Sequence, residues 1–282
     1  MASSELSGAR VLVMGLGAHG GGLASALYCI RHGAEVTVTD LRTADQLQSG
    51  VEALTEARAR LVLGEHREQD FSDADLVIKN PAVPRDSRFL KMAQRVETDV
   101  SIFLAGHRGP VYAVTGTKGK STTASALHYI LSAHDPRVRL GGNITVSPLS
   151  FADELAGDEP VVLELSSFQL GDLALTPLGS SGAIPRFALS AVTNLLPDHQ
   201  DYYPDMESYA SDKRVVFEHQ RPDDWVLLSA DDHYSREFTT PHPERTLRLT
   251  SRALSEEADA GEHDGVGVLR LPVAAHDQRD SA

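Results

Sequence analysis

A short run of small and basic residues at positions 116–121, GTKGKS, follows an apolar segment at 111–115. The apolar segment is rich in β-branched residues, which predicts a buried strand, and residues 125–131 have the composition of a helix. A glycine-rich turn between a strand and a helix N-terminus points backbone N–H groups and the positive end of the helix dipole at one place. The run therefore predicts a site for the phosphate groups of a nucleotide.

Each residue of this turn offers something different to a nucleotide. Lys120 would reach the β- and γ-phosphates, and the hydroxyl of Ser121 would bind Mg²⁺. The spacer between Gly116 and Gly119 is shorter than in the full Walker pattern, so the match is to a shortened phosphate loop. The alternative is a strand–helix turn that binds nothing. The residues that we assign to the phosphate site are Gly116, Thr117, Lys118, Gly119, Lys120, Ser121 and Thr122.

Two further polar groups follow predicted strands of the same region. Glu164 lies near the end of an apolar strand at 160–165, and His199 lies in a loop after the strand at 187–193. Ligands gather at the carboxyl ends of strands in open α/β sheets, where a carboxylate can bind Mg²⁺ and an imidazole can bind a metal or a phosphate. A buried acid paired with a basic residue and a solvated loop are the alternatives. Lys213, on a predicted helix at 204–220, has the sequence context of an ordinary surface lysine.

The N-terminal segment contains a second glycine-rich turn. A strand at 10–15 leads into Gly15-Leu16-Gly17, a helix at 20–32 follows, and a strand at 34–40 ends in Asp40. This order predicts a dinucleotide-type βαβ unit, in which glycines approach a diphosphate and the acid binds a ribose or a base. An NAD-dependent dehydrogenase and a tight turn without a ligand are the alternatives for this motif.

Strands alternate with helices along the chain, which predicts an α/β fold with parallel sheets. We expect a Rossmann-like domain at 1–107, a P-loop-type α/β domain at 108–273 and a polar tail at 274–282, because residues 106–110 combine glycine, proline and charge as linkers do. The other predicted elements are helices at 43–59, 88–95 and 99–105, strands at 60–63, 74–79, 137–140 and 225–229, paired strands at 246–249 and 265–271, a surface excursion at 178–185 and an acidic loop at 255–264.

Composition limits the classes of function. The 282 residues carry a net charge of −14, which argues against nucleic acid as the main partner. Cys29 is the single cysteine, so no internal disulfide can form, and the polar start lacks the apolar core of a signal peptide. No apolar run is long enough to cross a membrane. These features predict a cytoplasmic protein without a membrane partner.

The motifs TGTKGKSTT, GGN, ELSSFQL, TNLLPDHQDYYP and YASDK, in this order, resemble the Mur ligase family. ELSSFQL at 164–170 is the most specific of them, and it resembles the branch of the family that adds D-glutamate to UDP-N-acetylmuramoyl-L-alanine in peptidoglycan synthesis. The resemblance reaches to about Leu271. It implies an ATP- and Mg²⁺-dependent ligase that forms an amide through an acyl phosphate. Another family member, such as folylpolyglutamate synthase, is disfavoured by SSFQL and by the N-terminal glycine-rich unit.

The resemblance also implies a role for each matching residue. Lys120 and Ser121 would bind ATP phosphates and Mg²⁺, Glu164 and His199 would hold Mg²⁺ ions, and Lys213 would be carbamylated and support a second Mg²⁺. The implied substrate contacts are Gly15, Leu16 and Gly17 to the diphosphate, Asp40 and Leu41 to the uracil, Asn80 to the substrate, and Asn143 and Ser166 to the muramoyl group.

The sequence departs from the family pattern in two places. Lys118 stands where asparagine is commoner, and neither the family's third domain nor its His-Asn-x-x-Asn motif follows Leu271. We therefore expect binding of the precursor and of ATP phosphates, with slow or absent ligation by this chain alone. A truncated or frameshifted product, a fragment, a split enzyme with a separate C-terminal chain, or a non-catalytic nucleotide-binding protein would each have this sequence.

Overall fold

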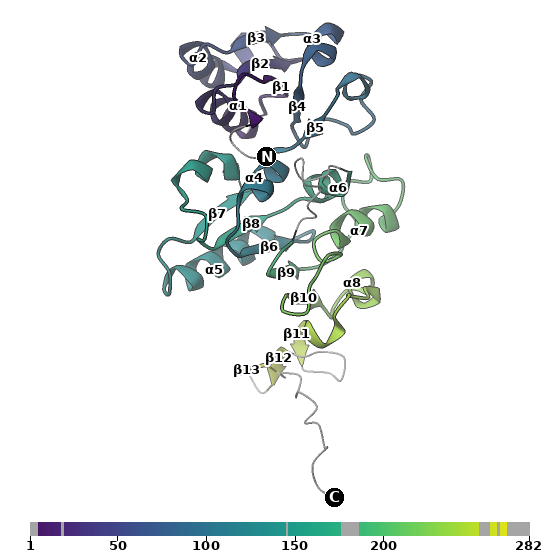
Figure 1. Ribbon diagram of the computed structural model, residues 1–282. Helices are drawn as coiled ribbons and strands as arrows, with labels where there is room; N and C mark the ends of the chain where they lie inside the picture. Colours follow the sequence, from purple (N-terminus) through teal and green to yellow (C-terminus); the bar gives the residue numbers. More distant parts are fainter. Residues whose placement is uncertain are drawn as a thin grey trace, which may run out of the picture.

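The computed structural model describes residues 5–17, 20–144, 146–175, 186–253, 260–263 and 266–269. Two α/β domains follow one another along the chain, each built on its own sheet (Figure 1). The chain passes from the first sheet to the second between Gly106 and Val111, inside the predicted linker. The domain boundary at residue 107 itself stays a prediction.

The first domain has a five-stranded parallel sheet in the order β3-β2-β1-β4-β5. Its central strand is apolar and buried from Val11 to Met14, as expected for a parallel strand with both faces covered. Its elements are β1 (Arg10–Met14), α1 (Gly21–Arg31), β2 (Glu35–Asp40), α2 (Gln48–Glu56), β3 (Arg60–Leu63), α3 (Glu68–Asp73), β4 (Leu76–Lys79), β5 (Val96–Glu97) and α4 (Asp99–Gly106).

The predicted helix at 88–95 is wrong. This segment contains only the short 3₁₀ turn Leu90–Met92, whose hydrogen bonds run over three residues, from Met92 to Phe89 and from Ala93 to Leu90. Phe89 and Leu90 pack into a small apolar cluster with Phe71, and the chain must enter β5 a few residues later. The segment is therefore too short to continue as an α-helix.

The second domain has an eight-stranded sheet in the order β13-β12-β11-β10-β9-β6-β8-β7. All of its neighbouring strands are parallel except β12 and β13, which are antiparallel. Its elements are β6 (Val111–Thr115), α5 (Lys120–Ser132), β7 (Arg139–Gly142), β8 (Val161–Glu164), α6 (Ser167–Leu175), β9 (Leu189–Val192), α7 (Met206–Arg214), β10 (Trp225–Ser229), α8 (His233–Glu237), β11 (Thr246–Ala253), β12 (Ala260–His263) and β13 (Val266–Leu269).

The edge of this sheet differs from the prediction. The strands expected at 246–249 and 265–271 do not pair with each other, because β12 lies between β11 and β13 and occupies part of the expected acidic loop. Asp264-Gly265, which separates β12 from β13 in the sequence, is a strong hairpin signal that the prediction overlooked. The predicted excursion at 178–185 and the polar tail at 274–282 lie outside the described residues.

The two domains share a packed junction. Helix α4 of the first domain contacts the short 3₁₀ turn Pro148–Ser150 of the second, and Leu149 in that turn is fully buried. The rings of Phe103 and Phe151 meet edge to face across the junction, with centroids 5.9 Å apart. Apolar packing therefore joins the domains below the polar surfaces that form the candidate site.

Candidate functional site

The phosphate loop joins β6 to α5, as predicted. Gly116 and Gly119 both have positive φ, at 136° and 82°, and a Cβ on Gly116 would overlap Thr193. Gly119 caps α5, which begins at Lys120, and no side chain caps the first N–H groups of this helix. These N–H groups and the helix dipole are therefore available to an anion at the loop.

The end of β9 anchors the loop from the neighbouring strand. The carbonyl of Asn194 accepts from the N–H of Thr117 and its side-chain oxygen accepts from the N–H of Lys118, each at 2.9 Å. The carbonyl of Lys118 accepts from the hydroxyl of Thr193 at 2.6 Å. The prediction assigned no role to Thr193 and Asn194. Their position after the strand that pairs with β6 was the available signal.

The interpretation of Lys213 as a surface lysine is wrong. It is 1% exposed, and its Nζ donates to the carbonyl of Gly116 at 2.9 Å and lies 4.8 Å from the centre of the Tyr209 ring. Burial, followed by the charge of Lys120, lowers the pKa of Lys213 to about 7. The surroundings beside the phosphate loop therefore favour the neutral amine more than water does.

The reason for this placement lies on one face of α7. Tyr209 and Lys213 are one helical turn apart, and both are turned toward β6 and its loop. The hydroxyls of Tyr209 and Thr117 are 3.0 Å apart, which fixes this face against the loop. Tyr209, Ala210 and Lys213 share the buried stripe of this helix. Their helical spacing could have indicated that Lys213 is buried, whereas its distance in the sequence from His199 could not.

Glu164 is placed as predicted, at the carboxyl end of β8 and 2% exposed. Its Oε1 accepts from Nδ2 of Asn143 at 2.9 Å, whereas its Oε2 is buried and has no hydrogen-bond partner among the described residues. The alternative of a buried acid paired with a basic residue is not what the described part of the chain shows. An unpaired buried carboxylate oxygen fits a cation, so Glu164 suits Mg²⁺ chemically.

His199 lies on the loop after β9 with its side chain 43% exposed. Its φ of 50° is unusual for a residue other than glycine, and such strain concentrates at functional sites. Its ring meets the Phe168 ring at 4.9 Å between centroids. Within the described ranges, no three His, Cys, Asp or Glu side chains form a metal-binding cluster. A Mg²⁺ ion held by Glu164 or His199 would therefore need oxygens from ligands, from water or from hydroxyls such as that of Ser121.

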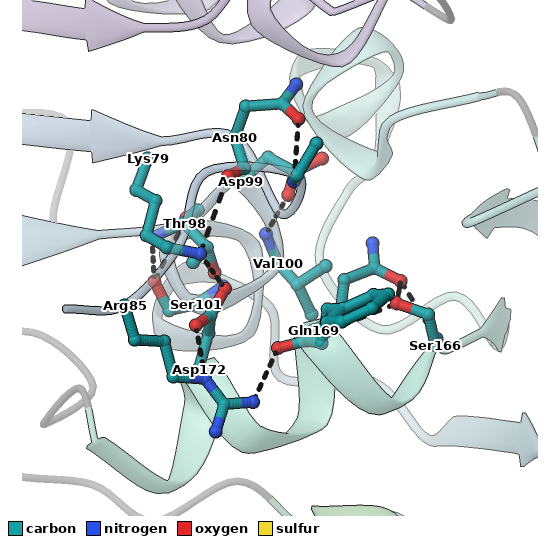
Figure 2. Close-up of polar contacts among 12 residues, drawn as sticks. Lys79, Asn80, Arg85, Thr98, Asp99, Val100, Ser101, Ser166, Gln169 and Asp172 are labelled. Atoms are coloured by element: carbon teal, nitrogen blue, oxygen red, sulfur yellow. Dashed lines mark hydrogen bonds and ion pairs between the residues drawn. The ribbon is translucent and has the colours of Figure 1, made fainter. Parts of the chain in front are cut away.

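A cleft of about 560 Å³ lies between the two domains. All of the predicted substrate residues except Leu16 line it, so residues far apart in the sequence meet in one place: Gly15, Gly17, Asp40, Leu41 and Asn80 from the first domain, and Asn143 and Ser166 from the second. Figure 2 shows Asn80 next to Lys79 of the first domain, and Ser166 of the second domain joined to Gln169 by dashed lines. Leu16 is buried, and it contributes its N–H to Asp40 instead of a surface to the cleft.

Asp40 organises the glycine turn. Its Oδ2 accepts from the N–H of Leu16 at 2.9 Å, and the guanidinium of Arg42 forms hydrogen bonds to both of its carboxylate oxygens. Although burial acts in the opposite direction, the hydrogen bonds from Arg42 and Leu16 hold the pKa of Asp40 below its ordinary value. Asp40 is therefore an ionised anchor whose oxygens are already engaged.

The cleft also contains residues that the prediction missed. Arg42 brings a cation to the wall beside Asp40, and Phe168 and Gln169 continue the wall from Ser166. Gln169 accepts from the N–H of Ser166 at 3.0 Å, which fixes this turn at the start of α6. Arg42 follows Asp40 by two residues, so an arginine just after the acidic strand end was the available signal.

Two segments of the chain match known protein-family models. Residues 9–102 match the family described as Mur ligase MurD-like, N-terminal domain, and residues 114–267 match the Mur ligase middle domain. The chain is 43% identical over 242 residues to the UDP-N-acetylmuramoylalanine–D-glutamate ligase of Borreliella afzelii, across 85% of this chain and 51% of that protein. It is 44% identical over 258 residues to the protein of the same name from Treponema pallidum, across 88% of this chain and 48% of that protein.

Among solved structures, the MurF ligase from Thermotoga maritima in complex with ADP matches with a TM-score of 0.46 and 19% identity, across 93% of this chain and 51% of that chain. The chain spans about half the length of the curated relatives it matches. Within the described residues, no helix is long and apolar enough to span a bilayer. The matched segments cover both sheets and the residues of the loop and the cleft. This chain belongs to the Mur ligase family.

Proposed function

We propose that this chain binds UDP-N-acetylmuramoyl-L-alanine and ATP and takes part in adding D-glutamate to that precursor. The contact between Asn143 and Glu164 carries the proposal, because Asn143 lines the interdomain cleft and Glu164 lies at the carboxyl edge of the sheet that bears the phosphate loop. A substrate lying in the cleft would thus present one end to the phosphate site. The names of the relatives, at 43% and 44% identity, support this choice of substrate.

The first domain would hold the UDP part of the precursor. Gly15 and Gly17 leave the backbone open to a diphosphate, and Asp40 and Leu41 lie where a uracil would end. Asn143 and Ser166 of the second domain would contact the muramoyl group. In this proposal the substrate domain spans residues 1–107 and the ATP domain spans residues 108–273.

The second domain would activate the carboxylate of the precursor. That carboxylate attacks the γ-phosphorus of ATP, so a C–O–P linkage forms as the bond to ADP breaks, and the amine of D-glutamate then displaces phosphate to form the amide. Lys120 and the loop N–H groups would neutralise the charge that develops during transfer. Mg²⁺ would supply further positive charge when bound, and Glu164, His199 and Ser121 are the residues that would hold it.

Lys213 would complete the metal site in a modified form. Its pKa of about 7 leaves a neutral amine that can add to carbon dioxide and lose a proton, which gives a carbamate. The added carboxylate would lie beside the loop carbonyl of Gly116 and would help to hold a second Mg²⁺. Because the reaction consumes ATP, we place it in the cytoplasm.

The test is a trapping assay with the purified 282-residue protein, the precursor, ATP and Mg²⁺. Hydroxylamine intercepts an acyl phosphate as a hydroxamate, which mass spectrometry detects. We expect hydroxamate that requires both the precursor and ATP and that disappears in Lys120→Ala. We assign no described side chain to D-glutamate, so we expect amide formation to be slower than hydroxamate formation. ATP hydrolysis that is indifferent to the precursor would contradict the proposal and favour a nucleotide-binding protein without ligase chemistry.

A further inference from the structure

Charged side chains join the two domains beside the cleft. Lys79, at the end of β4, donates to Asp172 of α6 at 2.5 Å, and Nε of Arg85 donates to the other oxygen of Asp172 at 3.0 Å. Figure 2 shows both basic side chains directed at this aspartate. Lys79 and Asp172 are both almost fully buried, so neither charge is free to exchange its partner for water.

Arg85 also reaches the next helix of the second domain. Its two terminal nitrogens donate to the two oxygens of Asp212 on α7, at 2.6 and 3.2 Å, and Nη2 also donates to the carbonyl of Phe168 at 3.4 Å. The hydroxyl of Tyr203 donates to Asp212 at 2.7 Å. The first domain thus supplies both cations of this cluster, and the second domain supplies both anions.

Gly171 is a second, independent sign that this contact shapes the fold. It lies inside α6, where glycine is less favourable than alanine. A Cβ at this position would overlap the Arg85 guanidinium and the carboxylate of Asp212. The glycine therefore makes room for an arginine that crosses the surface of the helix.

The cluster lies between the parts of the candidate site. Asn80 and Val83, between Lys79 and Arg85, line one wall of the cleft, and Phe168, whose carbonyl Arg85 contacts, lines the other. Asp212 is followed directly by Lys213, whose amine contacts the phosphate loop. Movement of Arg85 would therefore change the separation of the walls and the packing of α7 together.

We propose that Arg85 is a positioning residue that fixes the width of the interdomain cleft. It aligns the second-domain wall, which would contact the muramoyl group, with the first-domain wall, which would contact UDP. It does so by forming hydrogen bonds with two helices of the second domain at once. Lysine carries a single charged nitrogen instead of a planar guanidinium. It can therefore replace the charge of Arg85, but it cannot form hydrogen bonds with both helices at once. The identity of the ligand rests on the proposed function, whereas the domain geometry does not.

The direct test is a distance measurement between spin labels on Glu52→Cys in the first domain and Ala133→Cys in the second, both at exposed positions. Cys29 is buried and its pKa is raised to about 12, so it stays unlabelled. We expect a narrow distance distribution in the parent protein and a broad one in Arg85→Ala, Arg85→Lys and Gly171→Ala. Arg88→Ala, on the same loop but paired with Glu68 within its own domain, is the matched control. An unchanged distribution in Arg85→Ala would overturn the proposal.

Ligand titration separates this proposal from the proposed function. If the aligned arrangement falls to about a tenth of the population in Arg85→Ala, the apparent Kd for the precursor rises about tenfold. The Kd for UDP, which would touch the first domain alone, should change less than about twofold. Equal losses for both ligands would contradict a positioning role. If the parent protein does not bind the precursor while Arg85→Ala still broadens the distance distribution, the proposed substrate is wrong and the positioning role of Arg85 stands. Gly171→Ala keeps every charge, so it provides the test if Arg85→Ala does not fold.

Discussion

The phosphate loop and the interdomain cleft are built in different ways. The loop is one contiguous run between β6 and α5, held by the neighbouring strand end at Thr193 and Asn194. The cleft collects short pieces from both sheets, among them Gly15, Asp40 and Asn143. The loop therefore depends on the second domain alone, whereas the cleft exists only while the two domains keep their relative placement.

This difference separates local from global effects of mutation. A change in the loop should alter phosphate binding and leave the first domain intact. A change in the cleft or in the Arg85 cluster should alter ligands that touch both domains.

Lys120→Ala should weaken ATP binding by about 100-fold, because a charge-assisted contact to phosphate is lost without replacement. Isothermal titration calorimetry with ATP and Mg²⁺ measures the change. Lys91→Ala is the control, since Lys91 is exposed and lies in the first domain, outside the cleft and the loop. UDP affinity should be the same in both variants. An unaltered ATP affinity in Lys120→Ala would remove the loop from the ATP site.

Asp40→Ala should weaken UDP binding by about tenfold and lower the free energy of unfolding by about 1–3 kcal/mol, because Leu16 and Arg42 lose their acceptor. Urea denaturation and calorimetry with UDP check the two parts. Glu35→Ala, at the exposed start of the same strand, is the control. ATP affinity should not change, and a parallel loss of ATP affinity would mean that the two regions are not separate.

Lys213 should make stability depend on pH in a defined window. Its pKa is lowered from 10.5 in the unfolded chain to about 7 in the fold, so the unfolded state binds more protons between these values. The free energy of unfolding should therefore rise as the pH increases from about 7 to 10.5, and Lys213→Met should flatten this rise. Lys91→Met, at an exposed position, is the control for chemical denaturation at several pH values. A slope that survives Lys213→Met would assign it to another group.

The sequence predicted where the residues of the loop and Glu164 lie in the fold. Gly116, Gly119 and Lys120 could be placed from composition and order alone, because a strand, a glycine turn and a helix define their own geometry. Glu164 could be placed at a sheet edge for the same reason. The α/β fold and its parallel strands followed from the alternation of elements and are confirmed.

The parts that depend on tertiary packing were beyond the sequence patterns. The sequence around Lys213 is typical of a surface residue, and the residue is buried because α7 packs against β6. Leu16 lies inside a binding motif, yet it turns inward, and the helix expected at 88–95 gives way to a turn that the packing of Phe89 requires. Arg85 showed no signal, because its partners are 87 and 127 residues away in the chain.

The proposed function requires one ligand to span both domains through the cleft. Calorimetric titration of UDP-N-acetylmuramoyl-L-alanine and of UDP into the parent protein and Asn143→Ala tests it most directly. Asn143 lies in the second-domain wall, so we expect the precursor to bind about tenfold more weakly to the variant and UDP to bind equally to both proteins. Binding of the precursor that is equal in the two proteins, or no tighter than UDP in the parent, would contradict the account.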